Sequence, residues 1–421
     1  MNKAFAALLL AMPASAGAGF GLNSLRRRAR GSAAAGLAAL LCSALTQAGE
    51  AWKGPQLIGS RSTGIVGTGD FNRDGAVDVA YSRNGAFQWY AGPDLSEQSP
   101  EHDIGEGSGR SYGGTAVDIN GDGWPDLVAA DGARSSGPGR LWAFLHPGTA
   151  AGATSPWDRR EIWSLDVWHQ NDLAVADLDL DGRLDVVVRT RSDDLRLVIG
   201  LQNANFDTWT SRFWPTGETS NTPEGLAVGD VDSDGVPEIV LSGVYWDAPD
   251  GWRGGDPQEH MIDPEFVGRA VKSVVADLDG DGADDDVAMV TAEGSQRVYL
   301  AVYVHDGNPR GGASAWRREI LLDDVTNYHT LAAADFNQDG RTDLLAGAAF
   351  GSSGISVFYG GAEGFTEEVV DASGKMYVTS VADLNNDGAP DFVGPRVWQD
   401  RVVAYLSPPG TPQRVFADGF E

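Results

Sequence analysis

An acidic nine-residue motif with oxygen-bearing side chains at alternate positions occurs seven times along this chain of 421 residues. The copies are DFNRDGAVD, DINGDGWPD, DLDLDGRLD, DVDSDGVPE, DLDGDGADD, DFNQDGRTD and DLNNDGAPD, which begin at Asp70, Asp118, Asp177, Asp230, Asp277, Asp335 and Asp383. Alternating carboxylate and amide oxygens can surround one hard cation, and calcium takes about six to eight oxygen ligands. The motif therefore predicts up to seven calcium sites.

The expected side-chain ligands stand at motif positions 1, 3, 5 and 9. Position 1 supplies Asp70, Asp118, Asp177, Asp230, Asp277, Asp335 and Asp383. Position 3 supplies Asn72, Asn120, Asp179, Asp232, Asp279, Asn337 and Asn385. Position 5 supplies Asp74, Asp122, Asp181, Asp234, Asp281, Asp339 and Asp387. Position 9, where a bidentate carboxylate is expected, supplies Asp78, Asp126, Asp185, Glu238, Asp285, Asp343 and Asp391.

The other positions of the motif agree with a metal-binding loop. Position 6 is glycine in every copy, as expected where the chain turns sharply and a left-handed conformation costs little. An EF-hand would close with Glu at position 12 between two helices, whereas this motif closes at position 9 between short β-like runs. A metal-free Asx-rich hairpin loop is the alternative. The four copies with Asn at position 3 carry less charge, so weaker binding is expected there.

The motifs recur about every 50 residues, and each repeat contains about four short β-like stretches, the content of one propeller blade. After the last motif only two further strands are visible, 392–398 and 401–406. An unpaired stretch of the same type, Trp52 to Ile58, precedes the first motif. We therefore expect an all-β, seven-bladed propeller whose N-terminal strand, about 52–58, completes the last blade and removes the exposed sheet edges. An open solenoid is the alternative.

These motifs resemble the FG-GAP/VCBS repeat family, which includes the α-subunit propellers of integrins, over roughly residues 52–406. The resemblance implies calcium loops between the first and second strands of each blade, all on one face, with ligands bound on the opposite face. The chain departs from that pattern in two ways. All seven repeats keep the calcium motif, and the fourth is irregular because no clear third strand is visible in 245–266.

Aromatic and polar side chains precede several of the first strands and would surround the central channel opposite the calcium loops. Aromatic faces beside amide, imidazole and carboxylate groups suit sugar rings, although aromatic side chains that wedge between blades are the ordinary alternative. The ligand-face candidates are Tyr112, Trp168, His169, Tyr245, Trp246, Lys272, Tyr328, His329 and Tyr377. The histidines stand at equivalent positions of the third and sixth repeats, so repetition alone could explain them.

The sequence favours a non-enzymatic module that binds a glycan or a protein, for example in adhesion. It contains no G-x-S-x-G, H-E-x-x-H or phosphate loop, and the many Asp residues are already accounted for as calcium ligands. A carbohydrate-active enzyme resembling the polysaccharide lyases built on calcium propellers is one alternative, with His169, Lys272, Tyr328 or His329 as the base. A purely structural scaffold is the other.

Composition and the termini limit the cellular context. The net charge of −29 argues against nucleic acid or anionic lipid as partner. Two tandem segments before residue 49 each combine a basic start with a short apolar core and small residues, as in export signals, and the single cysteine, Cys42, lies there. We expect an export leader at 1–48, the propeller at 49–407 and a short tail at 408–421. A secreted, periplasmic or cell-surface monomer without a stable membrane span is expected.

Overall fold

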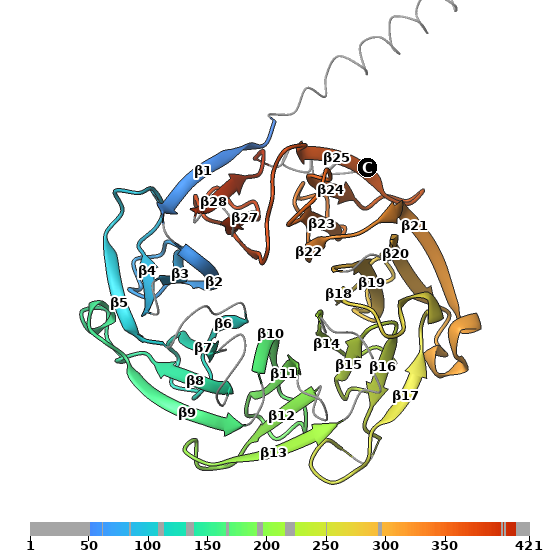
Figure 1. Cartoon of the computed structure of the whole chain (residues 1–421), viewed down its shortest axis with the longest axis horizontal. Coiled ribbons are helices and arrows are strands. Elements are labelled where there is room, and N and C mark those ends of the chain that lie inside the picture. The colour runs from blue at the N-terminus through green and yellow to red at the C-terminus, as the bar shows by residue number, and fades with distance from the viewer. Residues whose placement is uncertain are drawn as a thin grey trace, which may run out of the picture. The chain divides into compact units, whose positions relative to one another are not determined.

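A computed structural model describes residues 51–409 apart from 61, 84–85, 108–112, 132–138, 166–167, 192–196, 215–223, 250, 294–296, 397–398 and 400. These residues form seven four-stranded antiparallel sheets arranged as blades around a central axis (Figure 1). The predicted all-β, seven-bladed propeller is confirmed.

The first three blades follow one another along the chain. Blade 1 consists of β2 (Ser62–Gly69), β3 (Asp78–Arg83), β4 (Ala86–Tyr90) and β5 (Glu101–Glu106). Blade 2 consists of β6 (Gly114–Val117), β7 (Asp126–Asp131), β8 (Gly139–Leu145) and β9 (Asp158–Leu165). Blade 3 consists of β10 (Trp168–Ala176), β11 (Asp185–Arg191), β12 (Leu197–Gln202) and β13 (Trp209–Trp214).

The next three blades repeat this order from the innermost to the outermost strand. Blade 4 consists of β14 (Ala227–Gly229), β15 (Glu238–Leu241), β16 (Val244–Asp247) and β17 (Gln258–Met261). Blade 5 consists of β18 (Val271–Ala276), β19 (Asp286–Thr291), β20 (Val298–His305) and β21 (Trp316–Val325). Blade 6 consists of β22 (Tyr328–Ala334), β23 (Asp343–Ala348), β24 (Ile355–Tyr359) and β25 (Thr366–Asp371). The described 3₁₀ turns are Gly152–Thr154, Pro264–Phe266, Pro309–Gly311 and Ala313–Ala315.

Blade 7 is assembled from both ends of the sequence. Its inner strands are β26 (Ser380–Ala382), β27 (Asp391–Arg396) and β28 (Arg401–Leu406), and its outermost strand is β1 (Lys53–Ser60). Gln56 pairs with Ala404 and Leu57 with Val403 in an antiparallel register. The predicted closure of the ring by the N-terminal strand is therefore confirmed, and it gives the last blade the edge strand that it would otherwise lack.

Neighbouring blades are held together by apolar clusters, each shared by two adjacent sheets. Strand β11 illustrates the cause, because successive side chains of a strand point to opposite faces of its sheet. Val186 and Val188 pack toward blade 2, while Val187 packs toward blade 4, and all three are fully buried. A central strand buried on both faces explains why the second strands are nearly continuous apolar runs.

Blade 4 corrects one expectation from the sequence. The third strand, expected to be hard to place, is the short β16, which follows β15 through a turn at Ser242-Gly243 and pairs with it and with β17. The irregular part of 245–266 is confined to the connections after β16 and β17. The turn needs glycine, because Gly243 has φ of 82° and a Cβ there would lie 2.3 Å from the Asp263 carbonyl oxygen.

Candidate functional site

The acidic loops connect the first and second strands of every blade, and in six of the seven the second strand begins at the closing acidic residue. In the first loop, Asp70 Oδ1 accepts a hydrogen bond from the Asp74 backbone N–H (3.1 Å), and Oδ2 accepts one from Gly75 N–H (3.0 Å). Asp74 Oδ1 accepts one from Ala76 N–H (2.9 Å). These bonds bend the loop into a tight turn, with Gly75 at φ of 86°.

The position-9 carboxylate fastens the loop to the sheet. Asp78 is fully buried; its Oδ2 accepts from Phe71 N–H (2.8 Å) and its Oδ1 from Gly92 N–H (2.9 Å). Burial raises the pKa of Asp78 to about 7 against the opposing effect of these two bonds. Each oxygen keeps a second lone pair, so the bonds leave the position-9 carboxylate able to accept a further positive partner.

The fifth loop is one residue longer than its sequence suggests. Asp286, and not Asp285, accepts the backbone N–H bonds of Leu278 and Asp279 (both 3.0 Å) and begins β19. Asp285 instead accepts from Ser233 Oγ (2.9 Å) and lies 3.7 Å from His305 Nε2. The alignment of Asp285 with position 9 was therefore wrong: the DDD run allows a one-residue slip, and the buried strand selects the third carboxylate.

The third and fourth loops hold buried carboxylates on Asp179 and Asp232 whose Oδ1 atoms have no hydrogen-bond donor among the described residues, while each Oδ2 is met only by an arginine. Ligand atoms of Asp177, Asp179 and Asp185 lie within 4.8 Å of one another, as do those of Asp230, Asp232 and Asp234. Clustered carboxylates with so few donors are costly in a protein unless a cation compensates them. The donor set, hard anionic oxygen, fits calcium.

An arginine approaches each of these two loops. Arg253, in the segment after β16, pairs with Asp179 and lies 2.9 Å from Asp181 Oδ2. Arg310, in a turn of blade 5, lies 2.5 Å from Asp232 Oδ2 and 2.9 Å from Asp247 Oδ2. Both guanidinium groups therefore compensate part of the carboxylate charge that a bound cation would also compensate.

Three of the ligand-face candidates, Lys272, His329 and Tyr377, come together near the channel, at the ends of the first strands opposite the acidic loops. Their common partner is Glu224, which precedes β14. His329 Nδ1 lies 2.9 Å from Glu224 Oε2, the Tyr377 hydroxyl donates to Glu224 Oε1 (3.1 Å), and Lys272 Nζ lies 4.0 Å from Glu224 Oε2. Asp172 of β10 completes the group, with its Oδ1 2.5 Å from Lys272 Nζ. We call these five residues the channel network.

The channel network is buried and electrostatically coupled. Glu224 and His329 are each 1% exposed and Lys272 is 7% exposed. Burial opposes ionisation of Glu224, but His329, Lys272 and the Tyr377 hydroxyl outweigh it and lower the pKa of Glu224 to about 2. Glu293 and His329 lie close enough to Glu224 to form a metal triad, yet Lys272 beside Glu224 would repel a dication. The network acts as a polar connection between blades 3 to 7.

Sequence reasoning missed Asp172 and Glu224. No motif marks either residue, since Glu224 stands in a polar connection and Asp172 inside a strand. A buried lysine such as Lys272 indicates that an anionic partner must lie nearby. The sequence does not identify that partner, because it depends on how the blades are arranged in the ring.

The remaining candidates do not join this group. Tyr245 and Trp246 lie in β16. Tyr245 is fully buried and stacks on His260 (4.9 Å), so placing Tyr245 on an open face was wrong, whereas Trp246 is half-buried beside the cluster between blades 3 and 4. Tyr328 is 5% exposed and packs between blades 5 and 6. Tyr112 lies outside the described residues, and of Trp168 and His169 only the backbone, at the start of β10, is described.

Comparison with known proteins places the chain in a family. The FG-GAP-like repeat profile matches residues 70–129, 118–188, 177–241, 277–346 and 335–394, so the chain belongs to the FG-GAP-like repeat family. Each match runs from one acidic motif through the next, and the uncovered interval, 242–276, contains the segment with the short β16 and β17. No curated protein matches the chain.

Solved structures show the same fold at low sequence identity. The chain is similar to the β-propeller domain of Myceliophteria thermophila Cps50 (Swd1), with 10% identity over 83% of this chain and 99% of that chain and a TM-score of 0.51. The WD40 domain of Toxoplasma gondii coronin has 12% identity over 87% of each chain and a TM-score of 0.50. An Agrocybe aegerita lectin that recognises non-reducing terminal N-acetylglucosamine has 16% identity over 75% of this chain and 81% of that chain, with a TM-score of 0.49.

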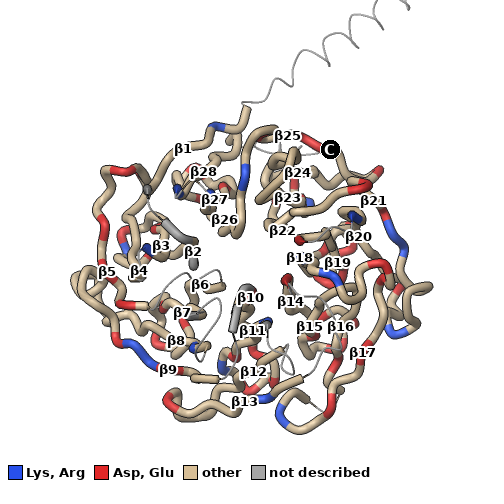
Figure 2. The backbone as a smooth tube through the Cα atoms, viewed as in Figure 1, with Lys and Arg blue, Asp and Glu red and all other residues tan. Residues whose placement is uncertain are grey.

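The fold and family define a module of the binding or scaffolding class. In the tube view of Figure 2, acidic residues are distributed around the whole ring rather than gathered on one side. None of the described helices has the length and hydrophobicity needed to cross a bilayer.

Proposed function

We propose that this chain is an exported, calcium-dependent binding module without enzymatic activity, which presents a glycan- or protein-binding face opposite its calcium loops. The observation that carries the calcium part is the pair of buried carboxylates at Asp179 and Asp232, each with an oxygen that no described donor satisfies, within tight acidic clusters. Clusters of this kind are stabilised when a divalent cation replaces the missing donors. The export-like leader supports a location outside the cytoplasm, where free calcium is plentiful.

Calcium would be held by the position 1, 3 and 5 side chains, the position 7 carbonyl and the position 9 carboxylate. Its chemistry here is structural, because it supplies the positive charge that these oxygens lack. The protein's own residues do the rest. Position 1 bends the loop, and position 9 ties it to the second strand through bonds such as Phe71 N–H to Asp78 Oδ2. Metal binding to such loops adds to folding stability, because the unfolded chain has no preformed site.

The geometry of the channel network favours binding over catalysis. A general base must reach the proton that it abstracts. His329 is 1% exposed, and its two ring nitrogens face Glu224 (2.9 Å) and Glu293 (3.8 Å). Lys272 is likewise engaged with Asp172 and Glu224. These residues support the face rather than act on a substrate, which counts against the polysaccharide lyase alternative.

Metal analysis combined with thermal unfolding tests the calcium proposal. The purified protein should contain several calcium ions per chain, and excess EDTA should lower the melting temperature strongly, with recovery on adding Ca²⁺ but not Mg²⁺. An unchanged melting curve in EDTA, or fewer than about two ions per chain, would contradict calcium dependence. A glycan array run alongside assays for new reducing ends and unsaturated products then separates binding from turnover.

A further inference from the structure

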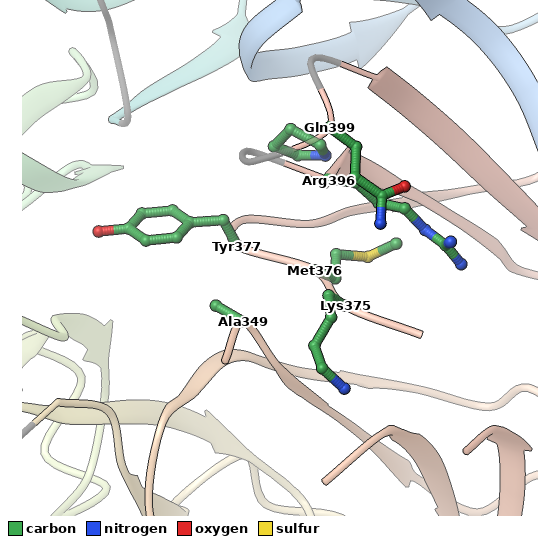
Figure 3. Close-up of a pocket in the computed structure, with 7 residues that line it drawn as sticks. Ala349, Lys375, Met376, Tyr377, Arg396 and Gln399 are labelled. Carbon is green, nitrogen blue, oxygen red and sulfur yellow. The ribbon is translucent and has the colours of Figure 1, made fainter. Parts of the chain in front are cut away.

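The pocket with the most distinctive chemistry on the proposed ligand face lies between blades 6 and 7, beside the channel network. It is lined by Ala349, Lys375, Met376, Tyr377, Pro395, Arg396 and Gln399 (Figure 3). Ala349 follows β23, Pro395 and Arg396 end β27, and Lys375 to Tyr377 precede β26. All these positions are at the strand ends opposite the acidic loops, so the pocket opens on the face proposed to bind the ligand.

The charged residues in the wall of this pocket are both cations, Lys375 and Arg396, although the chain has a net charge of −29. The walls of four other cavities formed by described residues include acidic side chains. These are Asp279, Glu319 and Glu363 in one, Asp263 and Glu265 in another, Asp172 in a third, and Asp230 and Asp284 in the fourth. Arg396 is paired with Asp371 (3.0 Å), so the positive charge of this pocket rests mainly on Lys375.

Lys375 retains a donor for a ligand, whereas Nη2 of Arg396 is engaged and its Nε is buried. Lys375 Nζ donates to the carbonyl oxygens of Ser353 (2.5 Å) and Gly374 (3.0 Å), forms no ion pair with a described residue, and has three donors in all. Arg396 Nη2 donates to Asp371 Oδ2 (3.0 Å) and the Tyr405 hydroxyl (2.6 Å). Its Nε is buried and has no hydrogen-bond partner among the described residues. Figure 3 shows the Arg396 and Gln399 side chains on one side of Met376 and the Lys375 side chain on the other, with the Tyr377 ring directed away.

The remaining walls are apolar, and their backbone groups are already paired. Met376 N–H donates to the Ala348 carbonyl oxygen (3.1 Å), Tyr377 N–H to that of Pro395 (3.3 Å) and Ala349 N–H to that of Asn327 (2.9 Å). A peptide would find few free backbone partners here for β-strand addition. A sugar ring needs only side-chain donors for its polar groups and apolar surface for its C–H face.

From these observations we propose that the pocket anchors the carboxylate of an acidic sugar, so that the ligand of this face is a uronate-containing glycan. The cavity of about 50 Å³ admits one carboxylate group and not a whole sugar ring, so the rest of the glycan lies over the surface around the pocket. Lys375 Nζ and the Gln399 amide supply the donors, and Arg396 adds a second positive charge to the wall. The inference rests on the proposed binding function of this face.

The experiment measures binding of four oligosaccharides to the calcium-loaded full chain by titration calorimetry. They are a uronate oligomer, the same oligomer as its methyl ester, a sulfated oligomer and a neutral oligomer. We expect the free uronate to bind and the methyl ester to bind at least about tenfold more weakly, because a charge-assisted hydrogen bond is lost. Lys375→Gln should weaken uronate binding by about tenfold. Arg317→Gln is the control. It removes one positive charge from an exposed position on the outermost strand of blade 5 and should leave the uronate affinity unchanged.

A second variant, Ala349→Leu, fills the pocket without changing charge and should also abolish preferential uronate binding. Thermal unfolding of each variant checks that the fold persists. Equal binding of ester and free acid, equal or tighter binding of the sulfated oligomer, or uronate affinity unaffected by both pocket variants would overturn the inference. Binding of only a neutral glycan or a protein would overturn it while leaving the proposed binding function intact. Binding of an acidic peptide that Lys375→Gln abolishes would show an anion pocket with a protein ligand, which also overturns the glycan assignment.

Discussion

His329 Nδ1 lies 2.9 Å from Glu224 Oε2, although His329 belongs to blade 6 and Glu224 to the connection that enters blade 4. The contact reaches across the start of blade 5, where the ammonium group of Lys272 lies 4.0 Å from the same carboxylate oxygen. A carboxylate buried to this degree is stable only while the partners that compensate its charge remain in place. The ring is therefore held by ionic contacts near the channel as well as by apolar packing between blades.

Replacing Glu224 with Gln should destabilise the protein by about 3–5 kcal/mol, because it leaves Lys272 and His329 without their shared carboxylate in a buried site. Tyr377→Phe removes only the hydroxyl bond to Glu224 Oε1 and should cost about 1 kcal/mol. Chemical denaturation at fixed calcium concentration measures both. If Glu224→Gln lowered the free energy of unfolding no more than Tyr377→Phe does, the channel network would contribute little to stability.

The Glu224 carboxylate should also make the stability of the protein depend on pH in the acidic range. The pKa of Glu224 is lowered from an ordinary value of 4.5 to about 2, since burial is outweighed by His329 and Lys272. A lowered folded-state pKa stabilises the protein above pH 4.5, and this contribution disappears as the pH falls toward 2. The stability difference between wild type and Glu224→Gln should therefore shrink over this interval. A difference that stays constant from pH 6 to pH 2 would contradict the assigned ion pairing.

Gly225→Ala should be strongly destabilising, because a Cβ at this position would lie 1.3 Å from the Val271 carbonyl oxygen of blade 5, with φ of 87°. The matched control is Gly251→Ala, where φ is 78° and no atom lies within 4 Å of the added carbon. The control should lose only about 1–2 kcal/mol from the left-handed backbone. We expect the Gly225 variant to lose at least about 4 kcal/mol in denaturation experiments. Similar losses of stability in Gly225→Ala and Gly251→Ala would mean that blades 4 and 5 can move apart easily.

Arg310→Ala should strengthen calcium binding at the fourth loop by about two- to tenfold, because its guanidinium competes for Asp232 and Asp247 and is partly exposed to water. Calcium titration calorimetry measures the change, with Arg317→Ala as the control for loss of a positive charge in the same blade. Weaker binding in Arg310→Ala would indicate that the arginine shapes the loop instead of competing with the cation.

Some of these structural features follow from local sequence alone. The acidic motif, its glycine and the alternating apolar residues identify strand–loop–strand units because turn geometry and strand pleating act over a few residues. Ring closure was also predictable, since the last blade lacked one strand and Trp52 to Ile58 supplied one of the same type. The slip from Asp285 to Asp286 marks the limit of this reasoning, because three consecutive Asp residues are locally equivalent and only burial of the second strand distinguishes them.

The sequence by itself determined the repeat, the blade count and the acidic loops. Only the tertiary structure decided which polar residues meet near the channel, because Asp172, Glu224, Lys272, His329 and Tyr377 come from five different blades or their connections. It also decided that Tyr245 is a core residue and that Lys375 and Arg396 share one pocket. Contacts between distant segments depend on how the blades curve into a ring, and no local sequence pattern encodes that arrangement.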